Sequence, residues 1–274
     1  MVTYYGTTAG GEANGDGTVF KITPSGTLTT LYNFCSQSGC ADGSEPEGAL
    51  IQATDGDLYG TTAAGGPNNQ GTVFKITPCG TLTTLHTFCS QGYPCTDGAD
   101  PEGALVQATD GNFYGTTIVG GAYNPGAGTI FQITPAGTLT TLYDFCSQTL
   151  CTDGAKPWAG LVQATNGTFY GTAEYGGTGG VYHDLGTIFS LSVGLGPFVK
   201  TLPACGEVGS PVKILGTNLT GATSITFNGT PATFTVVRPS EITTTVPVGA
   251  TTGTVQVVTP SGTLSSNVPF RVLP

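Results

Sequence analysis

Charged residues are scarce in this 274-residue sequence, where Asp, Glu, Lys and Arg make up 9% of the chain. An ordinary globular domain carries about 25%. Basic residues are the rarest, with 7 Lys and Arg against 17 Asp and Glu. The chain therefore lacks the positive charge that a nucleic-acid partner requires. It also lacks any apolar run close to the roughly 20 residues of a membrane-spanning helix, so we expect no membrane span.

Glycine and proline are abundant instead, with 44 Gly and 18 Pro spread along the chain. Both residues interrupt the interior of a helix, so their density excludes a mainly helical protein. Apolar residues make up 38% of the sequence, which argues against disorder. We therefore expect an all-β protein, and two domains are the natural expectation at this length.

Six of the eight cysteines lie in short-range pairs: Cys35 and Cys40, Cys89 and Cys95, Cys146 and Cys151. A cytosolic protein rarely carries so many matched thiols, so the pattern indicates an oxidising compartment. We predict three small disulfide loops, each contributing about 2 kcal/mol. Zinc is the alternative, but it takes four ligands and each loop offers two thiolates without a nearby His. Cys79 and Cys205 are left over; they pair with each other, within one chain or between two, or stay free.

Four imperfect repeats fill the first 196 residues. The string Gly-Thr-Thr starts at 6, 60 and 115, and Gly171-Thr172-Ala173 is a fourth copy, which gives spacings of 54, 55 and 56 residues. Gly-Thr-Val/Ile-Phe starts at 17, 71, 128 and 186, and Gly-Thr-Leu-Thr-Thr-Leu starts at 26, 80 and 137. Similarity at a fixed period is the signature of a repeat architecture.

One repeat reads as four short strands, which we place at 105–109 (A), 113–117 (B), 129–133 (C) and 138–142 (D). An Asp-Gly hairpin signal joins A to B. Four antiparallel strands in about 55 residues match the size of a β-propeller blade. We expect about 3.5 such units in residues 1–196. We count three C-D-A-B sets, an early strand B and a late strand C, which is 14 strands where four full blades need 16. Unfilled strand edges invite pairing with another chain.

Residues 197–274 differ in kind. They contain two of the 17 acidic residues and four of the seven basic ones, and their short alternating strands with frequent turns are typical of an immunoglobulin-like β-sandwich. The stretch Lys213–Leu219, followed by Ile225-Thr-Phe-Asn-Gly-Thr-Pro-Ala232, resembles an IPT/TIG domain. That resemblance covers nearly all of residues 197–274 and implies an Ig-like module.

The repeats resemble the GloVer tandem repeats of bacterial surface and secreted proteins, through the strings Tyr-Gly-Thr-Thr and Gly-Thr-Val-Phe-Lys-Ile-Thr-Pro-x-Gly-Thr-Leu-Thr-Thr-Leu. This resemblance implies an exported bacterial product, often anchored at the cell surface, and it implies no known reaction and no catalytic residues. The chain departs from the family in having fewer than four complete units. A strand is predicted directly after Met1, so we expect no signal peptide in this sequence, and no leader adds support for export.

Acidic segments follow two of the cysteine loops, and their members are Asp42, Glu45, Glu47, Asp97, Asp100 and Glu102. Such a group is a candidate calcium site, because Ca²⁺ prefers oxygen ligands. The alternatives are solvated turns, which we favour, and a pair of carboxylates for glycoside cleavage. The third copy has Lys156 and Trp158 at two of these positions, so the acids are not required in every repeat.

Other candidate residues are few. When the repeats are aligned, equivalent positions form columns, and His86 occupies the column of Tyr32 and Tyr143, which favours a packing role. His183 lies in a loop with Glu174 and Asp184. Neither histidine has the motif partner that nucleophilic catalysis needs. Trp158, the only tryptophan, is a packing residue or a glycan contact. Three Asn-x-Thr strings mark candidate glycosylation sites at Asn166, Asn218 and Asn228.

These features predict a non-enzymatic extracellular structural protein of the bacterial cell surface, a filament or adhesin subunit. The acidic repeats and the slightly basic sandwich could attract each other between chains, giving a head-to-tail homopolymer. A glycan-binding surface module, with or without calcium, is the alternative. A glycoside-active enzyme using the acidic loops is a third hypothesis. Calcium is the one cofactor considered.

Overall fold

The computed structural model describes residues 3–11, 15–123, 126–177 and 186–274. It is all-β, as predicted, apart from two short 3-10 turns, η1 (Ser38–Cys40) and η2 (Thr149–Cys151). The chain divides into two compact units: unit 1 comprises Met1–Val162 and Tyr170–Ser190, and unit 2 comprises Gln163–Phe169 and Leu191–Pro274. None of the helical segments in the described residues has the length and hydrophobicity of a membrane span.

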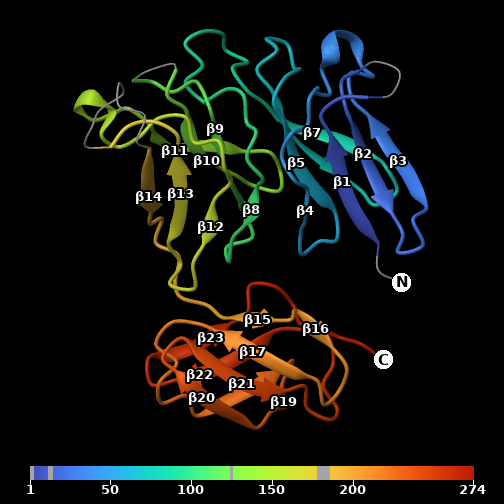
Figure 1. Cartoon of the computed structure of the whole chain (residues 1–274), viewed down its shortest axis with the longest axis vertical. Helices are drawn as coiled ribbons and strands as arrows, with labels where there is room; N and C mark the ends of the chain where they lie inside the picture. The colour runs from blue at the N-terminus through green and yellow to red at the C-terminus, as the bar shows by residue number, and fades with distance from the viewer. Residues whose placement is uncertain (1–2, 12–14, 124–125, 178–185) are drawn as a thin grey trace. The chain divides into compact units, whose positions relative to one another are not determined.

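Unit 1 is built from four small antiparallel sheets that follow one another in chain order (Figure 1). The first contains β1 (Tyr4–Thr8), β2 (Thr18–Ile22) and β3 (Leu28–Asn33). The second contains β4 (Ile51–Gln52), β5 (Leu58–Thr62), β6 (Thr72–Ile76) and β7 (Leu82–Thr87). The third contains β8 (Val106–Gln107), β9 (Phe113–Thr117), β10 (Thr129–Ile133) and β11 (Leu139–Asp144). The fourth contains β12 (Val162–Gln163), β13 (Phe169–Ala173) and β14 (Thr187–Leu191).

The described strands of unit 1 number 14, as the sequence predicts, but they group differently from the expected C-D-A-B sets. Each sheet runs A-B-C-D along the chain, so the first sheet lacks strand A and the fourth lacks strand D among the described residues. The reason is the length of the connections. A tight Asp-Gly or Asn-Gly turn keeps A and B in one sheet, whereas the disulfide loop carries the chain from strand D to the next sheet.

Aromatic side chains hold neighbouring sheets together. The Phe after strand D of one repeat meets the Phe of strand C in the next, with ring centroids 5.1 Å apart for Phe34 and Phe74 and 5.3 Å apart for Phe88 and Phe131. The third pair, Phe145 and Phe189, is 5.0 Å apart. These edge-to-face contacts are favourable geometries for aromatic pairs. The hydrophobic core of unit 1 therefore lies between the sheets.

Each sheet has two faces, which we name by their neighbours. The outgoing face contacts the following repeat, and the incoming face contacts the preceding one. Between the second and third sheets, outgoing Tyr59 stacks on incoming Phe113 with centroids 4.0 Å apart. Outgoing Val73 is fully buried in the same cluster. Side chains alternate between the two faces along a strand, so the residues of one repeat column lie on the same face in every repeat.

Glycine is required where the segments that lead into strand A approach one another. A Cβ atom on Gly103 would lie 2.8 Å from the backbone nitrogen of Gly160. Thr hydroxyls of strand B bond to these same segments, from Thr7 to Gly48 O (3.1 Å) and from Thr116 to Ala159 O (3.1 Å). Backbone contact therefore supplements side-chain packing at this side of the sheets.

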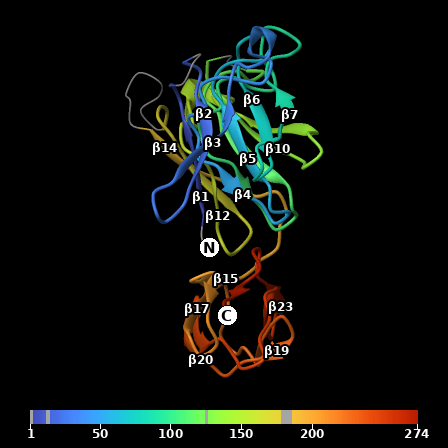
Figure 2. The same ribbon diagram turned by 90° about the vertical axis from the view of Figure 1, so that its right-hand side faces the viewer.

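Unit 2 is a β-sandwich of two four-stranded sheets, and Figure 2 shows β17 and β20 on one side of it and β19 and β23 on the other. One sheet has the order β15 (Lys200–Leu202), β17 (Pro211–Leu215), β21 (Glu241–Thr245), β20 (Phe234–Arg238). The other has the order β19 (Thr230–Pro231), β18 (Ser224–Phe227), β22 (Val255–Thr259), β23 (Gly262–Ser265). A parallel pair, β16 (Cys205–Gly206) and β24 (Arg271–Val272), completes the unit.

The core of unit 2 consists of the alternate residues that point between its sheets, and it includes Ile214, Phe227, Ile242 and Val257. Phe227 and Phe270 meet edge to face at 5.1 Å. The segment Gln163–Phe169, which is the turn between β12 and β13 with the adjoining strand ends, groups with this unit although the two strands belong to the fourth sheet. The backbone oxygen of Gln163 accepts a hydrogen bond from Lys200 Nζ at 2.9 Å.

Replacing Phe131 with Ala tests the packing between repeats. Phe131 is fully buried against the preceding repeat, so we expect a loss of about 3–5 kcal/mol in the free energy of unfolding. Phe20→Ala is the matched control, because Phe20 occupies the same column but is only partly buried on the incoming face of the first sheet. Denaturant unfolding with the disulfides intact should give the smaller loss for Phe20→Ala. Equal losses would contradict this account of the core.

Candidate functional site

The loops that join strand D to the next strand A carry most of the residues singled out in the sequence. In the structure each loop is closed by one disulfide: Cys35–Cys40, Cys89–Cys95 and Cys146–Cys151. The zinc alternative therefore does not apply to these six residues, because a sulfur in a disulfide is not a free thiolate.

A buried aspartate organises the first loop from within. The Asp42 carboxylate accepts hydrogen bonds from the Tyr32 hydroxyl (2.8 Å), from the hydroxyl and backbone N–H of Ser36, and from the backbone N–H of Gln37. Burial by itself would raise the pKa of Asp42, but hydrogen bonds from Tyr32 and Ser36 outweigh it and hold the pKa below its usual value. Asp42 is therefore an ionised cap for the loop.

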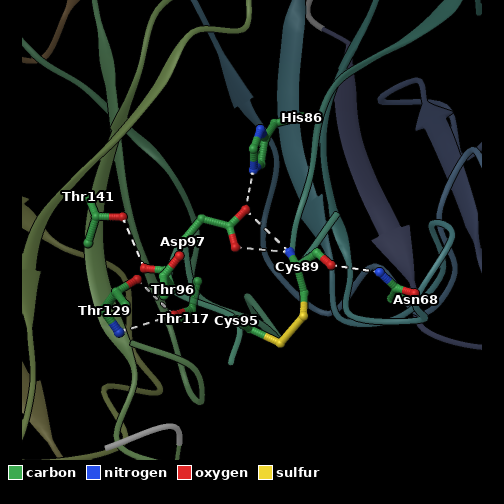
Figure 3. Close-up of polar contacts among 9 residues, drawn as sticks. All are labelled: Asn68, His86, Cys89, Cys95, Thr96, Asp97, Thr117, Thr129 and Thr141. Carbon is green, nitrogen blue, oxygen red and sulfur yellow. Dashed lines mark hydrogen bonds and ion pairs between the residues drawn. A yellow bond between two sulfur atoms is a disulfide. The ribbon is translucent and has the colours of Figure 1, made fainter. Parts of the chain in front are cut away.

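The other two loops use the same arrangement. Asp153 accepts hydrogen bonds from Tyr143 (2.7 Å), Ser147 and the backbone N–H of Gln148. In the second loop His86 replaces the tyrosine, and its Nε2 lies 2.9 Å from Asp97 Oδ2, while Cys89 N–H donates to the same carboxylate (Figure 3). The His86 ring also packs edge to face on Phe88, with centroids 5.0 Å apart, so it has the expected packing role together with a polar one. His183 and Asp184 lie outside the described residues.

These caps use two of the six acidic residues named as candidate calcium ligands. Asp42 and Asp97 bond to groups of their own disulfide loops, and calcium binding by the acidic residues stays a prediction. In the described part of the chain, the only three carboxylate, thiol or imidazole ligand atoms that lie within 4.8 Å of one another belong to Asp16, Cys35 and Cys40. The two sulfurs of that group are joined as a disulfide.

The remaining acids gather from two neighbouring loops. Burial and the negative charges of Glu47 and Asp100 raise the pKa of Glu102 to about 7. Burial, with the charges of Glu47 and Glu45, also raises the pKa of Asp100. Like charges that share a site disfavour full ionisation. Glu45, Glu47, Asp100 and Glu102 therefore form one acidic cluster, in which burial and like charge favour the protonated form of Glu102.

The backbone explains why these acids come together. Glu45, Asp100 and Lys156 occupy one column, and each has a positive φ, between 54° and 58°. The N–H of Asp100 donates to Gln70 O in the second repeat, and Asp100 O accepts from Ile118 N–H in the third. Glu45 and Lys156 make the equivalent pairs of bonds. The backbone of each residue in this column thus links two neighbouring repeats by hydrogen bonds, and these bonds fix the position of its Cα atom and side chain.

Trp158 lies in the column of Glu47 and Glu102. In the same loop, Lys156 occupies the position that is acidic in the two preceding repeats. Its indole N–H donates to the Glu174 carboxylate, and 45% of the residue is exposed. Lys156 lies over the Tyr175 ring, 5.4 Å from its centroid. The hydrogen bond holds the indole in one orientation with part of its surface open to solvent.

The two remaining cysteines do not form a disulfide with each other in this structure. Cys79 lies in the exposed turn between β6 and β7 in unit 1, and Cys205 is exposed in β16 of unit 2. Each is therefore accessible on its own unit, and a bond between chains stays a prediction.

The three candidate glycosylation residues differ in their environment. The Asn228 amide donates to Thr251 Oγ1 (2.8 Å) and Thr252 O (3.3 Å), so it serves the fold of unit 2. Asn166 Oδ1 accepts from Thr168 N–H within its hairpin turn. Asn218 is exposed, with a φ of 57°.

The residues that sequence reasoning missed lie on the outer faces of the first and fourth sheets. Ile188 is 82% exposed, while its column partners Val19, Val73 and Ile130 are buried. Tyr4 is 59% exposed, while its partners Leu58, Phe113 and Phe169 are buried. The aligned repeat columns carried this signal, since they show positions that require a neighbouring repeat.

Glu102→Gln tests the acidic cluster. In the unfolded chain the Glu102 carboxyl loses its proton near its ordinary pKa of 4.5, whereas the raised pKa of the native state keeps the proton bound up to about pH 7. Stability therefore falls as the pH rises between these two values. We expect the variant to be more stable than the original chain at pH 8 by about 1 kcal/mol after solvent screening, and equally stable at pH 4. Denaturant unfolding at both pH values measures this difference.

Glu207→Gln, at an exposed residue of unit 2, is the control and should show no such pH-dependent gain. A Glu102→Gln variant that is less stable than the original chain at pH 8 would contradict the account that burial and like charge disfavour an ionised Glu102.

Comparison with known proteins assigns both parts of the chain. The family model of the Gloeobacter/Verrucomicrobia repeat matches residues 3–233, and that of the IPT/TIG domain matches residues 198–272. Both resemblances noted in the sequence are thereby confirmed. A search of curated proteins finds no match.

Solved structures resemble the chain only distantly. A putative gluconolactonase is 14% identical, with 90% of this chain and 80% of that chain covered and a TM-score of 0.40. A putative 6-phosphogluconolactonase from Bacteroides uniformis is 14% identical over 93% and 75%, with a TM-score of 0.35. A putative oxidoreductase (glucose dehydrogenase) from Thermus thermophilus is 12% identical over 90% and 88%, with a TM-score of 0.36. Similarity at this level assigns no activity.

The repeat model, by contrast, covers most of the sequence, from the first described strand into the sandwich. The chain therefore belongs to the Gloeobacter/Verrucomicrobia repeat family and carries an IPT/TIG domain after its repeats.

Proposed function

We propose that this chain is a non-enzymatic structural protein of the bacterial surface or extracellular space, and that it assembles with further copies of itself. The carrying observation is the exposure of large hydrophobic side chains at both ends of the repeat series. Ile188 and Tyr4 are exposed in columns that are buried wherever a neighbouring repeat is present. Exposed apolar surface of this kind commonly marks an interaction site.

Three disulfides support an extracellular location, because such bonds persist in oxidising compartments. The use of polar side chains supports a structural role. Asp42, Asp97 and Asp153 serve as loop caps, and His86 is engaged with Asp97. Residues that could have served as acids or bases thus stabilise the connections between repeats.

The native mass of the chain tests this proposal. We expect light scattering on a sizing column, under non-reducing conditions, to show species larger than the 27.6 kDa monomer, in amounts that rise with concentration. Electron microscopy of the largest species should show open-ended particles, because a heterologous contact that does not close produces a filament. A monomer at every concentration would overturn the assembly part of the proposal.

Glycan binding is the second candidate function, and the half-exposed indole of Trp158 favours it. An aromatic face whose orientation is held by Glu174 is a suitable surface for stacking on a sugar ring. We expect the chain to bind on a glycan array, with and without calcium, and Trp158→Ala to abolish that binding. Trp158→Phe should retain part of it. An array without signal for the original chain would remove this candidate.

A further inference from the structure

We infer that copies of this chain join head to tail, with the outgoing face of the fourth sheet of one copy packed on the incoming face of the first sheet of the next. This inference rests on the proposed function, since it specifies which surfaces make the assembly. The occupant of each face is a second copy of this chain.

The argument begins with the outgoing face of the fourth sheet. Ile188 on β14 is 82% exposed and Tyr170 on β13 is 41% exposed. In the inner repeats the same two columns are buried, as Val73 and Tyr59 in the second repeat and Ile130 and Tyr114 in the third. The fourth sheet therefore presents an apolar surface of a kind that is covered in both inner repeats.

The incoming face of the first sheet is the matching surface. Tyr4 on β1 and Leu28 on β3 are 59% and 60% exposed. The residues that occupy the Tyr4 column in the second and third repeats, Leu58 and Phe113, are fully buried against the preceding repeat.

The contacts inside the chain show how these two faces would fit. Three successive interfaces each pack an outgoing face on an incoming face, with the phenylalanine pairs 5.0 to 5.3 Å apart. The next interface in this series would pack the fourth sheet on another incoming face, and the first sheet presents one. By the geometry of Tyr59 on Phe113, with centroids 4.0 Å apart, Tyr170 of one copy would stack on Tyr4 of the next.

The interface between copies should be weaker than those within the chain. Within the chain, the Phe after strand D crosses to the next repeat, and the described part of the fourth sheet has no strand D. The interface between copies thus lacks one aromatic pair and keeps the contacts of strands B and C. We therefore expect assembly that dissociates on dilution. The contact is heterologous, so each copy keeps one free face for the next.

Two single-face variants test the inference, made with Cys79→Ser and Cys205→Ser so that no disulfide can link copies. Ile188→Asp disables the outgoing face, and Tyr4→Asp disables the incoming face. At concentrations at which the parent with both Cys→Ser changes assembles, each variant alone should sediment as a monomer. The protein concentration needed for assembly should be at least tenfold higher for each variant than for this parent. An equimolar mixture should form a one-to-one dimer and nothing longer, because each partner retains the face that the other lacks.

Val248→Asp is the matched control, since Val248 is 86% exposed in unit 2, and it should assemble like the parent. Circular dichroism should show that all variants keep their β structure. The inference is overturned if Ile188→Asp assembles normally, if the mixture stays monomeric, or if Tyr4→Asp alone dimerises, which would indicate a two-fold contact between fourth sheets. In those cases the parent still assembles and the proposed function stands, whereas a monomeric parent overturns the proposed function itself.

Discussion

The packing of one repeat on the next is the interaction on which the rest of unit 1 depends. A sheet of three or four short strands cannot bury both of its faces alone, so each repeat relies on its neighbours for a core. The Phe after strand D, which crosses to strand C of the next sheet, recurs at three interfaces with nearly the same geometry. The disulfide loops, the aspartate caps and the column with positive φ all lie in the segment that makes this crossing.

The same dependence explains how the carboxylates of the disulfide loops are used. The loop between sheets must turn sharply and satisfy its backbone N–H groups, and buried N–H groups need acceptors. Asp42 and Asp153 supply those acceptors. The backbone links of Glu45 and Asp100 to both neighbouring repeats place acids of successive loops near one another. Burial, together with these negative charges, raises the pKa of Glu102.

Much of this fold could be predicted from the sequence, because repeats make each weak signal appear several times. The positions of strands B and C follow from alternating apolar residues next to Gly-Thr strings. In unit 2 the same alternation predicts strands at 212–215, 224–227, 232–236, 241–246 and 254–258, close to β17, β18, β20, β21 and β22. Strand A was predicted too long, since only Val106–Gln107 pairs in the third sheet. The short strands β15, β16, β19, β23 and β24 were missed, because pairs of two to four residues carry too little periodicity to be recognised.

The candidate site was harder to predict. Spacing in the sequence groups Asp42 with Glu45 and Glu47 as candidate calcium ligands. In the structure Asp42 caps its own disulfide loop, whereas the charges of Glu45 and Glu47 act on Glu102 of the next loop. The clustering of Glu47 with Glu102 depends on contact between repeats, which no single loop reveals. The exposed columns at Tyr4 and Ile188 were visible in the alignment of the repeats, but their exposure depends on which sheets have a neighbour.

Amide hydrogen exchange at low and high protein concentration tests the central claim most directly, because it reads the free faces of the repeat series one strand at a time. The account predicts that β1 and β14 gain protection as the concentration rises, while β10, which is already covered on both sides, does not change. Protection that stays constant in β1 and β14, or that rises only in the strands of unit 2, would contradict it.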